Sequence, residues 1–177
     1  MTRSVIVNKY GMDERQLKEL RAMAGDEEKL QALCKKWQDY DLLLPQIRSL
    51  VEGETDMIAN MANIVAALHE TFGFWWTGFY RVEGKELVLG PFQGPVACTR
   101  IPFGRGVCGT AWERGETIIV PNVHEFAGHI ACSSASKSEI VVPMRRDGQI
   151  IAVLDIDSAD YNTFDRIDQQ FLEKIIA

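Results

Sequence analysis

The residues best suited to do chemistry in this sequence are three cysteines that stand singly within one glycine-rich stretch. They are Cys98, Cys108 and Cys132. Cys132 lies in a polar segment, residues 124–137, that has neither a helical nor a strand period, and small residues flank it. A loop of that length inside a compact domain is usually functional. Because the thiolate is the reactive form of cysteine, an uncrowded thiol three residues after His129 is a candidate nucleophile.

On the residues alone, Cys132 can be either a reactive or a passive thiol. A second cysteine within reach would favour reactivity, because a sulfenic acid on one thiol condenses with another to give a disulfide. Cys98 lies on a strand-like run and Cys108 opens a short glycine-flanked helix, so either could face the loop. A structural zinc site needs closely spaced ligand pairs such as C-x₂₋₄-C. The single cysteines lack that spacing, so no metal is expected, and Cys34, on a lysine-flanked helix, is expected to be a structurally minor thiol.

Three carboxylates are candidates for binding or proton transfer. Glu139 begins one strand-like run, and Asp155 and Asp157 end the next, which is otherwise apolar over residues 151–156. Side chains two apart on a strand point to the same face, so the two aspartates are expected to lie together. They could simply form an exposed strand end. Alternatively, the three acids converge on one pocket, where burial and repulsion raise at least one pKa and the cluster suits an ammonium group.

Aromatic residues around position 78 supply a large apolar surface. Strand alternation places Trp76 and Tyr80 on one face, and Trp75 and Phe79 on the other. Such residues usually pack in a core, but a wall of this kind also suits a ligand that carries sulfur or a methyl group. Trp76 and Tyr80 are therefore candidates for the core and for a binding pocket.

Composition and charge narrow the class of protein. The 177 residues are 46% hydrophobic and 25% charged, as is typical of a globular protein with one sizeable core. The net charge of -6 argues against nucleic acid or a membrane surface as a partner, since both require basic patches. No apolar run approaches the roughly 18 residues of a membrane span. The N-terminus turns polar too early for a secretory signal, and four cysteines without framework spacing predict a reducing compartment, so we expect a cytoplasmic protein.

Hydrophobic periodicity predicts an α+β fold with a central antiparallel sheet flanked by helices. Two hairpins are indicated, one turning at Glu83–Lys85 and one at Asp147-Gly148, a strong two-residue turn signal. Helices are expected before and after them. They cover residues 13–37 with a break at Gly25-Asp26, then 41–52, 56–72 capped by Thr55, 107–113, and 164–176 capped by Asn162-Thr163. Residues 1–40 are interpreted as an N-terminal helical extension and residues 41–177 as the main domain.

Several motifs resemble those of one enzyme family. The chain closely resembles the free methionine-(R)-sulfoxide reductases over GPFQGPVACTRIPFGRGVCGTAWERGETIIVPNVHEF and over the later motifs GHIAC, SEIVVP and LDIDS. These are single GAF-domain enzymes that reduce the free amino acid rather than protein-bound methionine sulfoxide. The resemblance covers roughly Pro45 to Ala177 and implies a GAF-like fold. It is specific, because ordinary GAF sensor domains lack three cysteines in these contexts.

The resemblance implies roles for the matching residues. Cys132 of GHIAC is expected to be catalytic, Cys98 its usual resolving partner, and Cys108 an auxiliary or alternative partner. The expected substrate-binding residues are the three acids and two aromatics: Glu139, Asp155, Asp157, Trp76 and Tyr80. The chain departs from the family pattern at Ala127, where proline is expected, and at Ser133, where an acid is common.

The reaction that the resemblance implies is a thiol-dependent reduction. The Cys132 thiolate attacks the sulfoxide sulfur while Glu139 or Asp155 assists the departing oxygen, which leaves methionine and a cysteine sulfenic acid. Cys98 condenses with that sulfenic acid, and thioredoxin or a similar dithiol reduces the disulfide. No organic cofactor is expected, and a homodimer is possible. The alternative function is a non-catalytic GAF-type sensor of a small molecule or of redox state.

Overall fold

The computed structural model describes residues 9–128, 130 and 135–177. Cys132 and His129, which the sequence singled out, lie outside the described residues. The chain forms two compact units, Met1–Gln46 and Ile47–Ala177, and each is described by itself. Within the described part of the chain, no helix is both long enough and apolar enough to cross a membrane.

Two capped helices make up most of the first unit. Helix α2 (Glu14–Met23) begins with a capping box, in which the Asp13 carboxylate accepts from the Gln16 N–H and the Gln16 side chain accepts from the Asp13 N–H. Asp26 caps the start of α3 (Glu27–Val51) in the expected way, since its carboxylate accepts a backbone N–H at 2.7 Å. Cys34 on α3 is fully buried, with its Sγ 4.0 Å from the Met12 sulfur, which fits a packed thiol.

Helix α3 is one continuous helix, Glu27–Val51, where the sequence predicted two. That prediction was wrong because nothing between Trp37 and Asp41 breaks a helix, and Tyr40 in that gap is fully buried. Packing of an apolar stripe stabilises a helix more than local propensity does. Pro45 is accommodated within it. The expected domain boundary between residues 40 and 41 falls inside α3, so the start of the main domain stays a prediction.

The second unit is built on a six-stranded antiparallel sheet in the order β3-β2-β1-β6-β5-β4. Its strands are β1 (Trp76–Glu83), β2 (Glu86–Gln93), β3 (Arg100–Pro102), β4 (Ile118–Val120), β5 (Ser138–Arg146) and β6 (Gln149–Ser158). Both predicted hairpins are confirmed, β1–β2 and β5–β6. Asp147 and Gly148 both have positive φ, +52° and +79°, as a two-residue type I′ turn requires.

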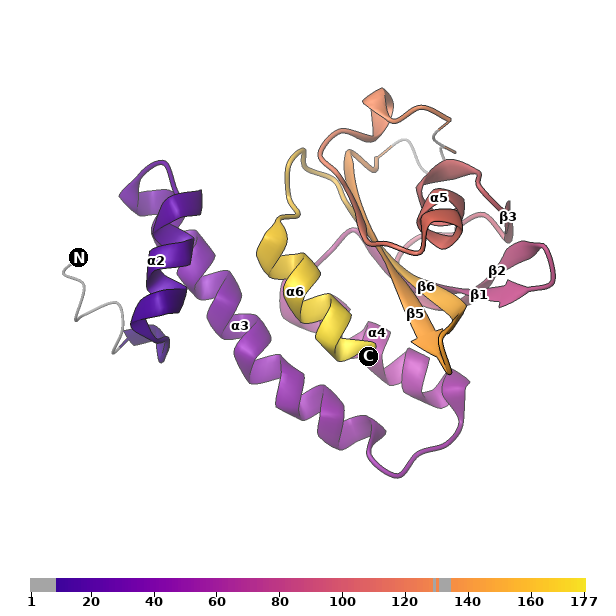
Figure 1. The fold of residues 1–177 in the computed structure, drawn as a ribbon, viewed down its shortest axis with the longest axis horizontal. Helices are drawn as coiled ribbons and strands as arrows, with labels where there is room; N and C mark the ends of the chain where they lie inside the picture. Colours follow the sequence, from indigo (N-terminus) through magenta and orange to yellow (C-terminus); the bar gives the residue numbers. More distant parts are fainter. Residues whose placement is uncertain (1–8, 129, 131–134) are drawn as a thin grey trace. The chain divides into compact units, whose positions relative to one another are not determined.

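Helices cover both faces of this sheet. Helices α4 (Met57–Phe72) and α6 (Arg166–Ile175) lie on one face, and α5 (Gly106–Arg114) lies on the other (Figure 1). The predicted α+β class is therefore confirmed. The N-caps differ from those expected: Asp56 caps α4 and Asp165 caps α6, because each carboxylate reaches a backbone N–H in the first turn. The short 3₁₀ helix η1 (Val123–Glu125) follows β4.

Candidate active site

A pocket opens between α5 and the face of the sheet that α5 covers. Its volume, counted to include open solvent at its mouth, is about 590 Å³. Strands β1, β5 and β6, the start of α5 and the segment after β2 all contribute to its lining. The side chains that carry its chemistry are Trp76, Tyr80, Cys108, Glu139, Asp155 and Asp157.

Strand register brings the three predicted acids together. Glu139 on β5 is the direct cross-strand partner of Asp157 on β6, and Asp155 lies two residues before Asp157 on the same face. All three line the pocket. Glu139 and Asp155 are each only 6% exposed, so they do not form the exposed strand end that was the alternative interpretation.

Burial and mutual repulsion favour the protonated forms of these acids. Burial raises the pKa of Glu139 well above its usual value, and the charges of Asp155 and Asp157 raise it further. Burial, together with the charge of Asp157, also raises the pKa of Asp155. Burial raises the pKa of Asp157 to about 6, although a hydrogen bond donated by the Ser136 hydroxyl works in the opposite direction. These shifts favour retention of a proton by Glu139 and Asp155, whereas Asp157 is mostly ionised at neutral pH.

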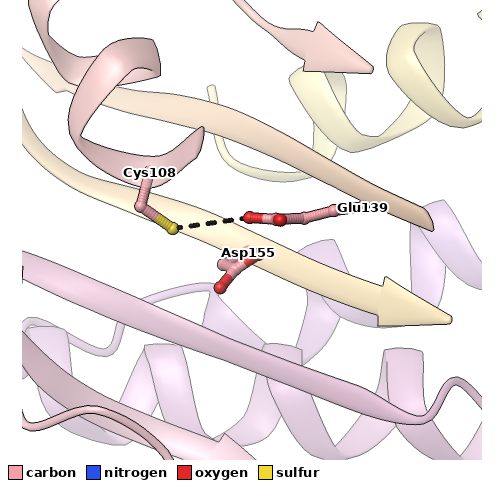
Figure 2. A group of neighbouring side chains, drawn as sticks. All are labelled: Cys108, Glu139 and Asp155. Carbon is pink, nitrogen blue, oxygen red and sulfur yellow. Dashed lines mark hydrogen bonds between the residues drawn. The ribbon is translucent and has the colours of Figure 1, made fainter. Parts of the chain in front are cut away.

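Cys108 lies on the first turn of α5 and points at the same acids. Its Sγ is 4.0 Å from Glu139 Oε1 (Figure 2). Burial raises the pKa of the Cys108 thiol well above its usual value, and the nearby Asp155 and Glu139 raise it further. Cys108 is consequently a protonated thiol that donates toward a carboxylate, which is the opposite of an activated nucleophile.

An aromatic wall faces the acids. The Trp76 ring stacks against Tyr80 and Phe92, with ring centroids 5.9 and 5.4 Å apart. The Trp76 indole N–H donates to the Pro95 carbonyl at 3.0 Å, which fixes the ring plane. Trp75 also lines the pocket, although alternation placed it on the opposite face from Trp76. It precedes β1, so strand alternation does not apply to it.

Tyr80 links this wall to Cys98. Its hydroxyl donates to the Cys98 carbonyl oxygen at 3.0 Å. Burial and the nearby acids raise the pKa of Tyr80, so the hydroxyl keeps its proton for that bond. Cys98 is disulfide-bonded, whereas Cys108 and Cys34 carry free thiols. Of the three cysteines expected at the site, the described residues therefore place Cys108 on the pocket floor and Cys98 beside its aromatic wall.

Ser136 and Ile130 are among the pocket residues that sequence reasoning missed. Ser136 is 4% exposed and bonds to Asp157, and Ile130 packs beside Gly106. Nothing in the sequence distinguishes Ser136 from its neighbour Ser138, whose hydroxyl instead donates to the Asp160 carbonyl.

Comparison with known proteins places the chain in a family. A GAF domain model matches residues 56–177. The free methionine-R-sulfoxide reductase of Escherichia coli is 48% identical over 143 residues, which cover 80% of this chain and 87% of that protein. The chain belongs to the GAF-domain free methionine-R-sulfoxide reductase family. The Saccharomyces cerevisiae protein of the same name is 44% identical over 149 residues, 79% of this chain and 83% of that protein.

Solved structures of the family agree with this fold. The reductase of Neisseria meningitidis, determined in complex with its substrate, is 55% identical and has a TM-score of 0.76. The match covers 77% of this chain and 83% of that one. The resemblance to this family is thereby confirmed, as is the GAF-like fold.

Proposed function

We propose that this protein reduces free L-methionine-(R)-sulfoxide to methionine. The observation that carries the proposal is the pocket in which three clustered carboxylates face an indole wall, in a chain 48% identical to a reductase of that name. A free amino acid carries an ammonium group that a residue within a peptide lacks. Buried carboxylates give that ammonium charge-assisted hydrogen bonds, which are stronger than neutral ones. The Trp76 ring offers a polarisable surface to the sulfur and methyl group.

The acids divide two tasks. Asp157, with a pKa of about 6, is mostly ionised at neutral pH and binds the ammonium. Glu139 and Asp155 have more strongly raised pKa values, so one of them keeps a proton to give to the sulfoxide oxygen. The same burial that disfavours their charge therefore supplies the acid for the reaction.

The cysteines supply the electrons. The Cys132 thiolate attacks the sulfoxide sulfur while the oxygen takes a proton; methionine leaves, and Cys132 keeps the oxygen as a sulfenic acid. The Cys98 thiol then condenses with it, releasing water and forming a disulfide that thioredoxin or a similar external dithiol reduces. Two observations favour Cys98 over Cys108 as the resolving residue: Cys98 is disulfide-bonded, and Cys108 is a free, buried thiol.

Turnover of the separate sulfoxide epimers tests the function. We expect the R epimer of free methionine sulfoxide to be reduced with dithiothreitol, and its N-acetyl derivative to be a poor substrate because it lacks the ammonium. Cys132→Ser should abolish the reaction, whereas Cys34→Ser, which removes a buried thiol of the first unit, should not. A non-catalytic sensor would bind the sulfoxide without turnover. Full activity of Cys132→Ser would overturn the mechanism.

A further inference from the structure

Cys108, Glu139 and Asp155 form a compact group of possible metal ligands on the pocket floor. The Cys108 sulfur and one carboxylate oxygen from each acid all lie within 4.8 Å of one another, and all three residues are buried. They come from three elements, α5, β5 and β6, and Figure 2 shows them gathered at one point. The three residues are far apart in the sequence, so the group contains no closely spaced ligand pair of the kind that marks a structural zinc site.

A second observation indicates room for a ligand at this point. Asp155 is 6% exposed, yet its Oδ1 accepts no hydrogen bond within the described part of the chain. Buried polar atoms without a partner are uncommon in native proteins, because each one costs about 1–3 kcal/mol. Asp155 lines the pocket, so a cation that enters the pocket can reach this oxygen.

We propose that Zn²⁺ binds to the reduced, substrate-free protein through Cys108 Sγ and one carboxylate oxygen each from Glu139 and Asp155. A set of one thiolate and two carboxylates suits zinc, whereas Mg²⁺ and Ca²⁺ require about six or more oxygen ligands. The thiol proton, and any proton held by the two carboxyl groups, leaves to solvent as the metal binds.

The distance between the Cys108 and Glu139 ligand atoms suits a tetrahedral ion after a small adjustment. With Zn–S near 2.3 Å and Zn–O near 2.0 Å, tetrahedral geometry places sulfur and oxygen about 3.5 Å apart. The Cys108 sulfur and Glu139 Oε1 are 4.0 Å apart, so rotations of the two side chains need to close only about 0.5 Å. Three protein ligands leave the fourth position open toward the pocket, as in zinc sites that exchange a small ligand.

Zinc in this position blocks the pocket. It takes two of the three acids that face the substrate and adds positive charge where an ammonium would bind. Zinc and the free amino acid therefore exclude each other. This competition rests on the proposed function, whereas the binding of zinc itself does not.

Equilibrium binding to the full chain, reduced with a phosphine that does not bind zinc, tests the site. We expect wild type and Cys34→Ser to bind Zn²⁺ equally, and Co²⁺ to give thiolate charge-transfer absorption in both. Cys108→Ser should lose that absorption and bind Zn²⁺ roughly 100-fold more weakly, since even outer partners of metal ligands change affinity by about 10–100-fold. The near-isosteric Asp155→Asn should weaken Zn²⁺ binding while keeping the thiolate band with Co²⁺. Mg²⁺ should not displace Co²⁺.

Three results would overturn the site: no binding of Zn²⁺ by wild type, unchanged affinity in Cys108→Ser, or loss of binding in Cys132→Ser instead.

Competition is measured separately, by adding L-methionine to the Co²⁺ form. Methionine should remove the absorption at concentrations where glycine, which chelates similarly but lacks the side chain, does not. If zinc binds but no sulfoxide is reduced, the proposed function fails and the site stands. If sulfoxide is reduced but zinc does not bind, the metal site fails and the proposed function stands.

Discussion

Replacing Ser136 by alanine is a direct test of how the pocket controls the charge of Asp157. The Ser136 hydroxyl donates to Asp157 Oδ1, and Ser136 itself is almost fully buried at the pocket lining. This bond stabilises the ionised carboxylate and so lowers the pKa of Asp157, against the burial that raises it to about 6. Removing the hydroxyl should raise that pKa further, because only the burial remains.

The size of the effect follows from the energy of the hydrogen bond. A bond to a charged acceptor is worth about 1.5–3 kcal/mol, and about 1.4 kcal/mol corresponds to one pKa unit. Ser136→Ala should therefore raise the pKa of Asp157 from about 6 to roughly 7–8. At neutral pH the wild-type carboxylate is mostly ionised, whereas that of the variant is half protonated or more. The variant then lacks the negative charge that we propose binds the substrate ammonium.

Steady-state kinetics from about pH 5.5 to about pH 9 can measure this shift, because protonation of Asp157 weakens substrate binding and so raises KM, and kcat/KM reports the same ionisation of the free enzyme. The KM of Ser136→Ala for free methionine sulfoxide should exceed that of wild type near pH 7, and the two should converge above about pH 8.5 as Asp157 ionises in both. Ser138→Ala is a matched control, since that hydroxyl bonds to a backbone carbonyl instead. Superimposable pH profiles of KM for Ser136→Ala and wild type would refute the reasoning.

Three further predictions concern stability, the aromatic wall and the thiols. Because the pKa of Asp157 is raised, its ionisation destabilises the fold progressively from about pH 4 to about pH 6, and the full cost is present above about pH 6. Asp157→Asn removes that cost. The free energy of unfolding of the variant, measured with denaturant and compared with that of wild type, should therefore be about 1–3 kcal/mol more favourable to the fold at pH 7.5 than at pH 4. In Gly78→Ala the new Cβ would overlap the Trp76 ring and lie 2.5 Å from Phe92 Cβ, so KM should rise and stability fall by about 1–3 kcal/mol. Cys98→Ser should slow thioredoxin-driven turnover more than dithiothreitol-driven turnover, since a small thiol reduces the sulfenic acid directly.

Features set by local chain geometry could be predicted from the sequence. Asp147-Gly148 specifies a two-residue turn, and that turn sets the register of β5 on β6. Strand alternation then places Asp155 and Asp157 on one face, as they are found. The opposition of Glu139 and Asp157 could not be predicted in this way, because the turn alone would pair Glu139 with Ile156 and a register shift between Met144 and Arg145 moves the pairing to Asp157.

Features set by packing between distant segments could not be predicted. Cys108 and Glu139 are 31 residues apart, and only the docking of α5 on the sheet brings the thiol to the acid. The sequence also does not predict that Ser136 bonds to Asp157, because the hydroxyls of Ser136 and Ser138 differ only in which groups the folded chain places beside them. The continuity of α3 was missed for a similar reason: the burial of Tyr40 is a tertiary property.

Burial of like charges at one strand junction connects the binding, proton-transfer and metal-binding roles proposed for this pocket. Strands β5 and β6 place three carboxyl groups side by side under α5, and desolvation makes three simultaneous negative charges unfavourable there. Without a bound cation, Glu139 and Asp155 favour their protonated forms. A ligand that brings positive charge, whether an ammonium or Zn²⁺, allows the acids to ionise and takes the place of those protons. A ligand without positive charge does not favour ionisation of Glu139 and Asp155 and offers Asp157 no cationic partner, so the pocket selects for a cationic group whatever the ligand's side chain.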